Sequence, residues 1–267
     1  MFFTNVFGEG TTVFFPFPVP ELVINYPNTL FVVYLDGFNG VECSGSIVSE
    51  HYILTTAQCL KRAPNKGFTV VDNLGLAKRL KVNTFILHPD YNPTSGDNNI
   101  GLIYIEEALK KNLSVPLALD YEELPDHELK LAGFGPKKII DSGYESMEVH
   151  HYYSSKANSC PMKLCKDLKG DENNFVCTSE AKGTDFKPKS GGPLFVNGTD
   201  DEFYVFGLQI TEINAESPKS SSLPMLHIRV SKYCDWIAKS TKDEVKCRPY
   251  PGYKNSVPKE KLIGKIV

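Results

Sequence analysis

The chain has 267 residues, 41% of them hydrophobic and 23% charged, which is an ordinary composition for a folded globular protein. Its formal net charge of −3 gives no basic excess for binding nucleic acid or an anionic membrane surface. No run of 18 apolar residues occurs, so the sequence predicts no membrane span.

Short apolar segments separated by turn residues run through most of the chain. Stretches such as DGFNG, APNKG and VNGTDDE lie between them and are typical of turns. Many short strands at this spacing predict an all-β protein, either an antiparallel sandwich or a barrel. The expected strands lie at 30–35, 46–56, 68–71, 83–88, 100–105, 129–135, 146–153, 191–196, 203–210 and 225–230.

Helical periodicity is clear near the C-terminus, in VSKYCDWIAKST at 230–241. There Tyr233, Trp236 and Ile237 fall on one face of a helix. The residues that follow are rich in lysine and show no core-like pattern, so we expect a solvated basic tail. A docking patch for an acidic partner is the alternative interpretation of this tail.

Seven cysteines and two glycosylation sequons indicate an extracellular protein. Asn112 lies in NLS and Asn197 lies in NGT, and both are candidates for N-glycosylation. The odd number of cysteines leaves one over whatever the pairing. The first residues, MFFTNVFGEG, lack the basic segment of a signal peptide, but we still expect a secreted glycoprotein.

Four segments, in order, resemble the trypsin/chymotrypsin-like serine proteases (peptidase family S1). CSGSIVSEHYILTTAQC (43–59) is similar to the family's first disulfide loop, which usually ends in Ala-Ala-His-Cys. HPDYNPTSGDNNIGLIYI (88–105) resembles the segment that contains Asp-Ile-Ala-Leu-Leu. SGGPL (190–194) resembles the end of Gly-Asp-Ser-Gly-Gly-Pro-Leu, and IRVSKYCDWI (228–237) resembles the last strand and terminal helix. The resemblance covers roughly residues 25–240.

This resemblance implies two six-stranded antiparallel β-barrels, a C-terminal α-helix and a site in the cleft between the barrels. It also implies a disulfide between Cys43 and Cys59, and it leaves either Cys160 or Cys165 as the partner of Cys177. It offers no template for the two remaining cysteines. The expected divisions are an N-terminal extension (1–20), a protease domain (21–245) with barrels at about 21–122 and 123–230 and a helix at about 231–245, and a basic tail (246–267).

Catalysis in this family needs a general base beside the serine and a carboxylate that orients the base. Gln58 stands at the base position, and an amide cannot accept a proton near neutral pH. Asn99 stands at the carboxylate position, and that loss alone typically lowers turnover about 10⁴-fold. Ser190 is retained, while Asp97 is expected to point elsewhere. The sequence therefore predicts a degenerate triad.

The oxyanion hole and the activation switch are altered as well. The family uses the N–H of a glycine two residues before the serine, and here Pro188 has no N–H to donate. Lys189 replaces the aspartate that pairs with the new N-terminal amine after activation. No Lys or Arg precedes Lys61, so the usual activation cleavage has no basic residue to follow.

The specificity pocket of the family is also changed. Thr184 leaves the pocket floor without a charge that would select a basic side chain. Glu212 and Met225 stand at wall positions where the family keeps glycines, and their side chains should fill or block the pocket. Ile210 and Thr211 replace the Ser-Trp that bonds the substrate backbone.

These changes together predict a secreted, non-catalytic homologue that binds or regulates a protein partner as a cofactor or decoy in a proteolytic or immune cascade. In this hypothesis Ser190 and its following glycines are structural. No cofactor and no metal are expected, and the sequence does not identify the partner. Two alternatives stay open: an endopeptidase that uses Ser190 in an unconventional way, and a purely structural storage, venom or seminal component.

Overall fold

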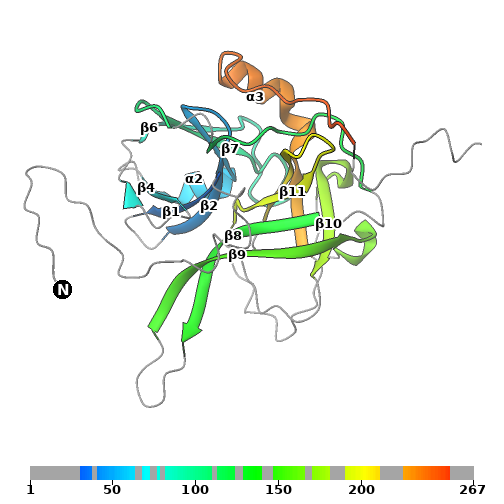
Figure 1. Ribbon diagram of the computed structural model, residues 1–267, viewed down its shortest axis with the longest axis horizontal. Helices are drawn as coiled ribbons and strands as arrows, with labels where there is room; N and C mark the ends of the chain where they lie inside the picture. Colours follow the sequence, from blue (N-terminus) through cyan, green and yellow to red (C-terminus); the bar gives the residue numbers. More distant parts are fainter. Residues whose placement is uncertain are drawn as a thin grey trace, which may run out of the picture.

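The computed structural model describes residues 31–252 except for several internal stretches. Those stretches are 38–40, 64–67, 73–76, 79–81, 110–112, 124–128, 140–146, 166–169, 181–189 and 211–224. The regular structure of the described chain consists mainly of antiparallel strands that form two sheets (Figure 1). The predicted all-β class is therefore confirmed.

The first sheet contains seven strands in the order β5-β4-β1-β2-β3-β7-β6. Strand β3 lies inside this sheet between β2 and β7, and all four of its residues are buried, which suits its sequence YILT. At one end of this order lies β5, which has two residues and pairs only with β4 among the described strands. The bounds are β1 Val32–Gly37, β2 Val41–Ile47, β3 Tyr52–Thr55, β4 Phe68–Asp72, β5 Ala77–Lys78, β6 Val82–Leu87 and β7 Gly101–Ile105.

The second sheet is a closed six-stranded barrel in the order β10-β13-β12-β11-β8-β9, as predicted for this half of the chain. Its longest pairing is the β8–β9 hairpin, in register from Leu129 opposite Ala157 to Ile139 opposite Met147, which projects from the barrel in Figure 1. The strands are β8 Leu129–Ile139, β9 Met147–Ser159, β10 Phe175–Glu180, β11 Pro193–Asn197, β12 Phe203–Gln209 and β13 Met225–Arg229.

Helices are short in the described residues. Helix α2 (Ala57–Arg62) follows β3, and helix α3 (Cys234–Ser240) follows the last strand through the 3-10 turn η4 (Val230–Tyr233). Two further 3-10 turns, η2 (Met162–Leu164) and η3 (Glu172–Asn174), lie between β9 and β10.

The C-terminal helix is shorter than the predicted 231–245 because the backbone turns left-handed just after it. Lys242 and Asp243 have φ values of 51° and 67°, which an α-helix cannot contain. The Thr241 hydroxyl donates to the Ile237 carbonyl (2.9 Å) and accepts from the Val245 N–H (3.1 Å), so it closes the turn that follows.

The first residues of the expected tail pack on the domain instead of leaving it. A disulfide joins Cys247 to Cys234. The Arg248 N–H donates to the Leu117 carbonyl (2.8 Å), and the Leu119 N–H donates to the Arg248 carbonyl (2.9 Å). The Tyr250 ring lies 5.1 Å from the ring of Tyr121. Residues 253–267 lie outside the described chain.

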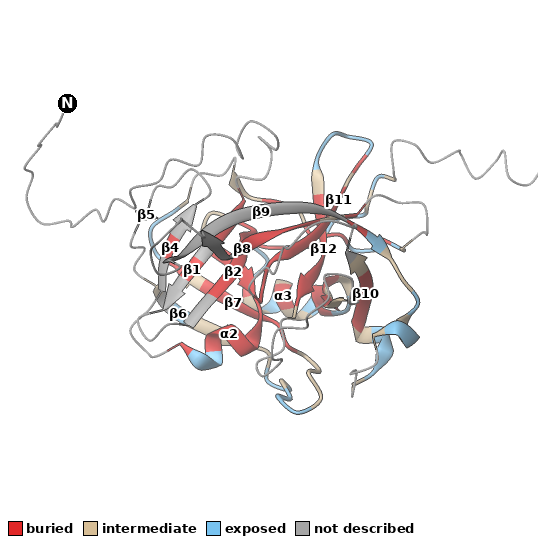
Figure 2. Cartoon of the chain, turned by 90° about the horizontal axis from the view of Figure 1, so that it is seen from below, coloured by how far each residue is buried: buried red, intermediate tan, exposed pale blue. Residues whose placement is uncertain are grey.

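The core continues from one sheet into the other. Its larger cluster includes Leu35 and Ile53 of the first sheet and Phe175 and Leu208 of the barrel. A smaller cluster fills the barrel interior, and Figure 2 shows buried residues along the strands of both sheets. The two sheets therefore share one apolar junction, at which the candidate site lies. Within the described residues, no helix is long and apolar enough to cross a membrane.

Candidate functional site

Helix α2 holds the first predicted site residue at the junction of the two sheets. The helix starts directly after β3, and the disulfide between Cys43 and Cys59 ties it to β2. This cross-link is the one that the family resemblance implies. It lies next to Gln58, which is buried together with the rest of the first turn of the helix.

Gln58 and Asn99 form a pair of amides that hydrogen-bond to each other in both directions. The Gln58 backbone N–H donates to the Asn99 side-chain oxygen (2.8 Å), and the Asn99 side-chain nitrogen donates to the Gln58 side-chain oxygen (3.2 Å). Asn99 is 1% exposed and Gln58 is 7% exposed, so water does not compete strongly for these bonds. The structure thus brings the two predicted positions together, with neutral groups at both.

Ser190 lies against the same junction and is 6% exposed. Its hydroxyl lies 3.1 Å from the Thr56 hydroxyl and donates to the Gln209 backbone carbonyl at 3.3 Å. Neither a threonine hydroxyl nor a peptide carbonyl takes up a proton near neutral pH. These two contacts hold the Ser190 side chain in place.

Thr56 is a site residue that the sequence alone did not reveal. The signal was present, because Thr56-Ala57-Gln58-Cys59 stands where the family usually has Ala-Ala-His-Cys. A hydroxyl in place of a methyl group adds a hydrogen-bonding partner directly beside the retained serine.

The glycines after Ser190 join the two sheets. The Ser190 carbonyl accepts from the Ser44 N–H (2.8 Å) of β2, while the Gly191 N–H donates to the Gln209 carbonyl (2.9 Å) of β12. Gly191 has a φ of 91°, and a Cβ there would lie 2.2 Å from the Ser44 carbonyl oxygen. A Cβ on Gly192 would lie 2.5 Å from the Ala132 carbonyl oxygen of β8. The turn therefore requires glycine for steric reasons.

Most of the predicted oxyanion and pocket residues lie outside the described residues. These are Thr184, Pro188, Lys189, Thr211 and Glu212. Met225 is described at the start of β13, half-buried, and its sulfur lies 3.7 Å from the Gln209 side-chain nitrogen. It packs against the smaller, barrel-interior core cluster.

Asp97 points away from the amide pair and toward the second half of the chain. One of its oxygens accepts from the Asp171 N–H (3.1 Å), and the other accepts from the Ser95 hydroxyl (2.8 Å). A Cβ on Gly170 would lie 2.3 Å from the first of these oxygens. Asp97 thus links the β6–β7 loop to the segment before β10, as expected of a residue that points elsewhere.

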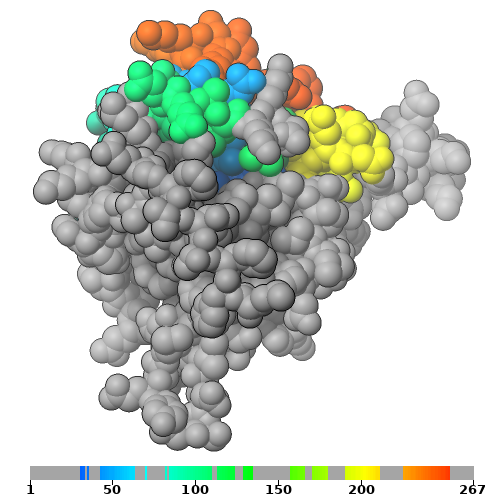
Figure 3. All heavy atoms as spheres, turned by 60° about the vertical axis from the view of Figure 1, so that its left-hand side comes forward, coloured from blue at the N-terminus to red at the C-terminus, as the bar shows by residue number. Residues whose placement is uncertain are grey.

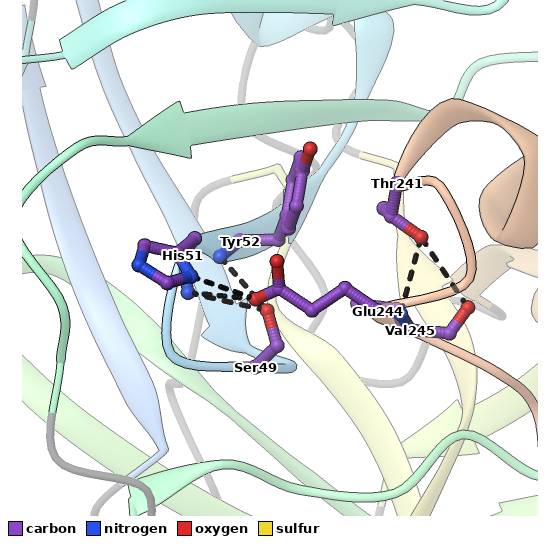
Figure 4. A network of polar contacts seen from close by, with 6 residues as sticks. All are labelled: Ser49, His51, Tyr52, Thr241, Glu244 and Val245. Carbon is purple, nitrogen blue, oxygen red and sulfur yellow. Dashed lines mark hydrogen bonds and ion pairs between the residues drawn. The ribbon is translucent and has the colours of Figure 1, made fainter.

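The histidines whose side chains are described all have partners elsewhere. Figure 4 shows His51 beside Glu244, with the ring Nδ1 3.0 Å from the carboxylate and the backbone N–H donating to the same oxygen (3.2 Å). In Figure 3 the orange C-terminal region lies against blue and green atoms from earlier parts of the chain. The His88 ring lies 5.1 Å from the Trp236 ring in a tilted arrangement, and the His227 Nε2 lies 2.8 Å from the Thr178 hydroxyl.

The cysteines form two further disulfides besides Cys43–Cys59. One joins Cys165 to Cys177, which selects one of the two open pairings, and the other joins Cys234 to Cys247; Cys160 is free. No group of three or more metal-ligating side chains occurs among the residues that the structure describes.

The two glycosylation candidates differ in what is known of their placement. Asn112 lies outside the described residues, whereas Asn197 ends β11 and is half-buried. Its side-chain oxygen is buried without a hydrogen-bond partner in the described chain, and its backbone carbonyl accepts from the Tyr250 hydroxyl (2.9 Å).

Comparisons with known proteins agree with this architecture. The family model described as Trypsin matches residues 25–237. Trypsin from Phaedon cochleariae is 26% identical over 216 residues, which cover 74% of this chain and 78% of that protein. Glucanase inhibitor protein 3 from Phytophthora infestans is 28% identical over 219 residues, 78% of this chain and 80% of that protein. A solved structure described as "Structure of GrC" has a TM-score of 0.60 at 23% identity and covers 80% of this chain and 95% of its own.

Proposed function

The chain belongs to the trypsin family, and from this premise we propose that it is a non-catalytic member that acts by binding a protein partner. In this proposal it is secreted and glycosylated, and it serves as a cofactor or decoy in an extracellular proteolytic or immune cascade. Its three disulfides are typical of proteins that work outside the cell.

The mutually hydrogen-bonded amide pair of Gln58 and Asn99 carries the proposal. In an active member of this family, a histidine takes the serine proton and a carboxylate stabilises the imidazolium that results. Here both positions are neutral amides that hydrogen-bond to each other, and the Ser190 hydroxyl donates to a backbone carbonyl. The two hydrogen-bond partners of the Ser190 hydroxyl, the Thr56 hydroxyl and the Gln209 carbonyl, are not bases, which supports a loss of nucleophilic catalysis.

The residues before Ser190 support the same conclusion from the sequence. Pro188 cannot donate a hydrogen bond to an oxyanion, and the loss of one such donor costs about 3–4 kcal/mol of transition-state stabilisation in comparable enzymes. Lys189 brings a positive charge to a position where activation needs a negative one. Thr184 gives the pocket floor no charge, and the side chains of Glu212 and Met225 are expected to fill or block the pocket.

A binding role fits a fold whose framework is kept while its chemistry is changed. The relative from Phytophthora infestans is named as an inhibitor protein and not as a protease. Its similarity covers 78% of this chain. Fold alone does not fix function, so the argument for binding rests on the altered site and not on the family.

The test is cleavage of a diverse peptide library by the purified full chain, with Ser190→Ala as the matched control. We expect the native chain and the variant to cleave equally little over a day, while an active trypsin added to a parallel sample cleaves normally. Cleavage by the native chain that disappears in Ser190→Ala would contradict the proposal and favour an unconventional endopeptidase.

The binding role needs a separate measurement on the fluid in which the protein occurs. The full chain is immobilised beside a variant whose residues 182–190 are replaced by a Gly/Ser segment of equal length. We expect one protein to be enriched on the native chain and absent from the variant. Equal recovery on both surfaces would favour a structural or storage role.

A further inference from the structure

Three cysteines lie together where β9 meets β10 in the barrel. Cys165 and Cys177 form a disulfide, and the Sγ of the free Cys160 lies 3.0 Å from the Sγ of Cys177. The backbone holds this contact, because Cys160 follows β9 and its N–H donates to the Cys177 carbonyl at 3.0 Å. Cys160 therefore lies directly across the strand pair from a sulfur that is already bonded.

A thiol beside a disulfide can exchange with it. We propose that Cys160 and Cys165 compete for Cys177, so that the chain carries one disulfide in either of two positions that interconvert. This inference does not depend on whether the chain is catalytic.

The exchange is balanced within the protein. The Cys160 thiolate attacks the Sγ of Cys177, the Cys160–Cys177 bond forms and the Cys165–Cys177 bond breaks. Cys165 leaves with the electron pair and takes up a proton equivalent to the one that Cys160 released. One disulfide and one thiol exist before and after the step, so no external oxidant or reductant is consumed.

The surroundings of Cys160 make the exchange slow near neutral pH. Burial raises the pKa of the Cys160 thiol, so little of the attacking thiolate is present. The Cys160 and Cys165 residues are both half-buried, which leaves them within reach of small thiols that can relay the exchange. The two disulfide forms should therefore persist long enough to be separated and identified.

The position of the disulfide decides which residues are tethered to the barrel. With Cys165 bonded, the 3-10 turn η2 is held against β10, and Met162 of that turn lines a surface groove of about 520 Å³ together with Glu172 and Arg229. Moving the bond to Cys160 releases residues 161–165 from this tether. Exchange would then change one wall of the groove.

The experiment maps the disulfides of the native full chain. Samples are taken before and after incubation of the protein in a glutathione redox buffer. Each sample is acidified to stop exchange, its free thiol is alkylated with N-ethylmaleimide, and its non-reduced peptides are identified by mass spectrometry. We expect both Cys160–Cys177 and Cys165–Cys177 peptides, in a ratio that the buffer moves toward one fixed value. A single form that the buffer leaves unchanged would overturn the proposal.

Two matched variants test the same point independently. In the Cys160→Ser variant Cys165 should pair with Cys177, and in the Cys165→Ser variant Cys160 should do so. Each variant should therefore have no free thiol, where the native chain has one. A folded Cys165→Ser variant that keeps two free thiols would also overturn the proposal. The mapping of the native chain decides the question even where a variant fails to fold.

Discussion

The backbone at Gly191 leaves no room for a side chain, and this is the strongest steric constraint in the candidate site. Its φ of 91° lies in the left-handed region, and a Cβ would meet the Ser44 carbonyl oxygen at 2.2 Å and the Thr55 hydroxyl at 2.3 Å. We expect Gly191→Ala to lower the free energy of unfolding by about 3 kcal/mol or more, which denaturant titration measures.

Gly96 provides the matched control because it shares the unusual backbone and lacks the clash. Its φ is 78°, yet a Cβ there would have no heavy atom within 4 Å. Gly96→Ala should therefore cost only the backbone term of about 1–2 kcal/mol. If the two variants lost the same free energy of unfolding, the close contact between the two sheets at Gly191 would contribute nothing to the cost of the substitution.

His227 is a neutral histidine inside the barrel. It is fully buried against Thr178, its Nδ1 has no hydrogen-bond partner among the described residues, and burial lowers its pKa from 6.5 to about 3. The unfolded chain therefore binds a proton on this residue below pH 6.5, while the folded chain does so only near pH 3. Stability from this residue is complete above pH 6.5 and decreases as the pH falls through this window.

The effect can be measured by comparing native protein with His227→Gln at pH 7 and pH 5. We expect the native chain to lose about 2 kcal/mol more than the variant over this interval, because glutamine does not titrate. The comparison uses the difference between the two pH values, so any constant destabilisation by the substitution cancels. The same pH dependence in both proteins would contradict the assignment of a neutral, buried His227.

The sequence was sufficient to identify Gln58, Asn99 and Ser190 as one site, because the family motifs fix their positions along the chain. It did not identify the Thr56 contact, since a hydrogen bond between residues 134 positions apart depends on how the two sheets pack. Nor did it indicate that the two amides would bond to each other in both directions. Such pairs depend on side-chain torsions that no local pattern encodes.

Among the elements, the segment after α3 acts as a clasp, which we define as residues 241–252. It contacts both halves of the chain, because Glu244 bonds to His51 in the turn before β3 while Tyr250 packs on Tyr204 of the barrel, with ring centroids 5.5 Å apart. The Cys234–Cys247 disulfide closes it with a sequence separation of 13. The clasp therefore holds together elements that are far apart along the chain.

Removing the disulfide of the clasp should destabilise the whole domain. We expect Cys234→Ser combined with Cys247→Ser to lower the free energy of unfolding by about 3 kcal/mol, the value for a loop of this size in the chain-entropy model. Thermal and denaturant unfolding of the double variant measure the loss. A loss below about 0.5 kcal/mol would mean that the clasp is not coupled to the fold.

The strands were predictable from short apolar runs, whereas the end of the chain was not. An alternating apolar pattern indicates a strand that buries one face, and a fully apolar run indicates a strand that buries both, so the strands can be predicted from the sequence. The helix, however, stops at Ser240 because Lys242 and Asp243 adopt positive φ, which is uncommon for residues other than glycine. The packing of residues 246–252 likewise depends on partners near Leu117 that are distant in sequence.

For the molecule as a whole, one apolar core runs between the sheets, and the Ser190–Gly192 turn lies at their junction. Retention of Ser-Gly-Gly is then explained by packing, since the turn bonds to β2 on one side and β12 on the other. A family member can lose its chemistry and keep this junction, because the fold needs the glycines whether or not the serine reacts.

The central claim, that Ser190 is not a working nucleophile, is tested most directly by labelling the native full chain with a fluorophosphonate. The probe bonds covalently to an activated serine whatever the specificity pocket accepts, and intact-mass spectrometry counts the labelled chains. We predict no labelling above that of Ser190→Ala, under conditions in which active trypsin is labelled completely. One label per native chain, located on Ser190 and absent from the variant, would contradict the claim.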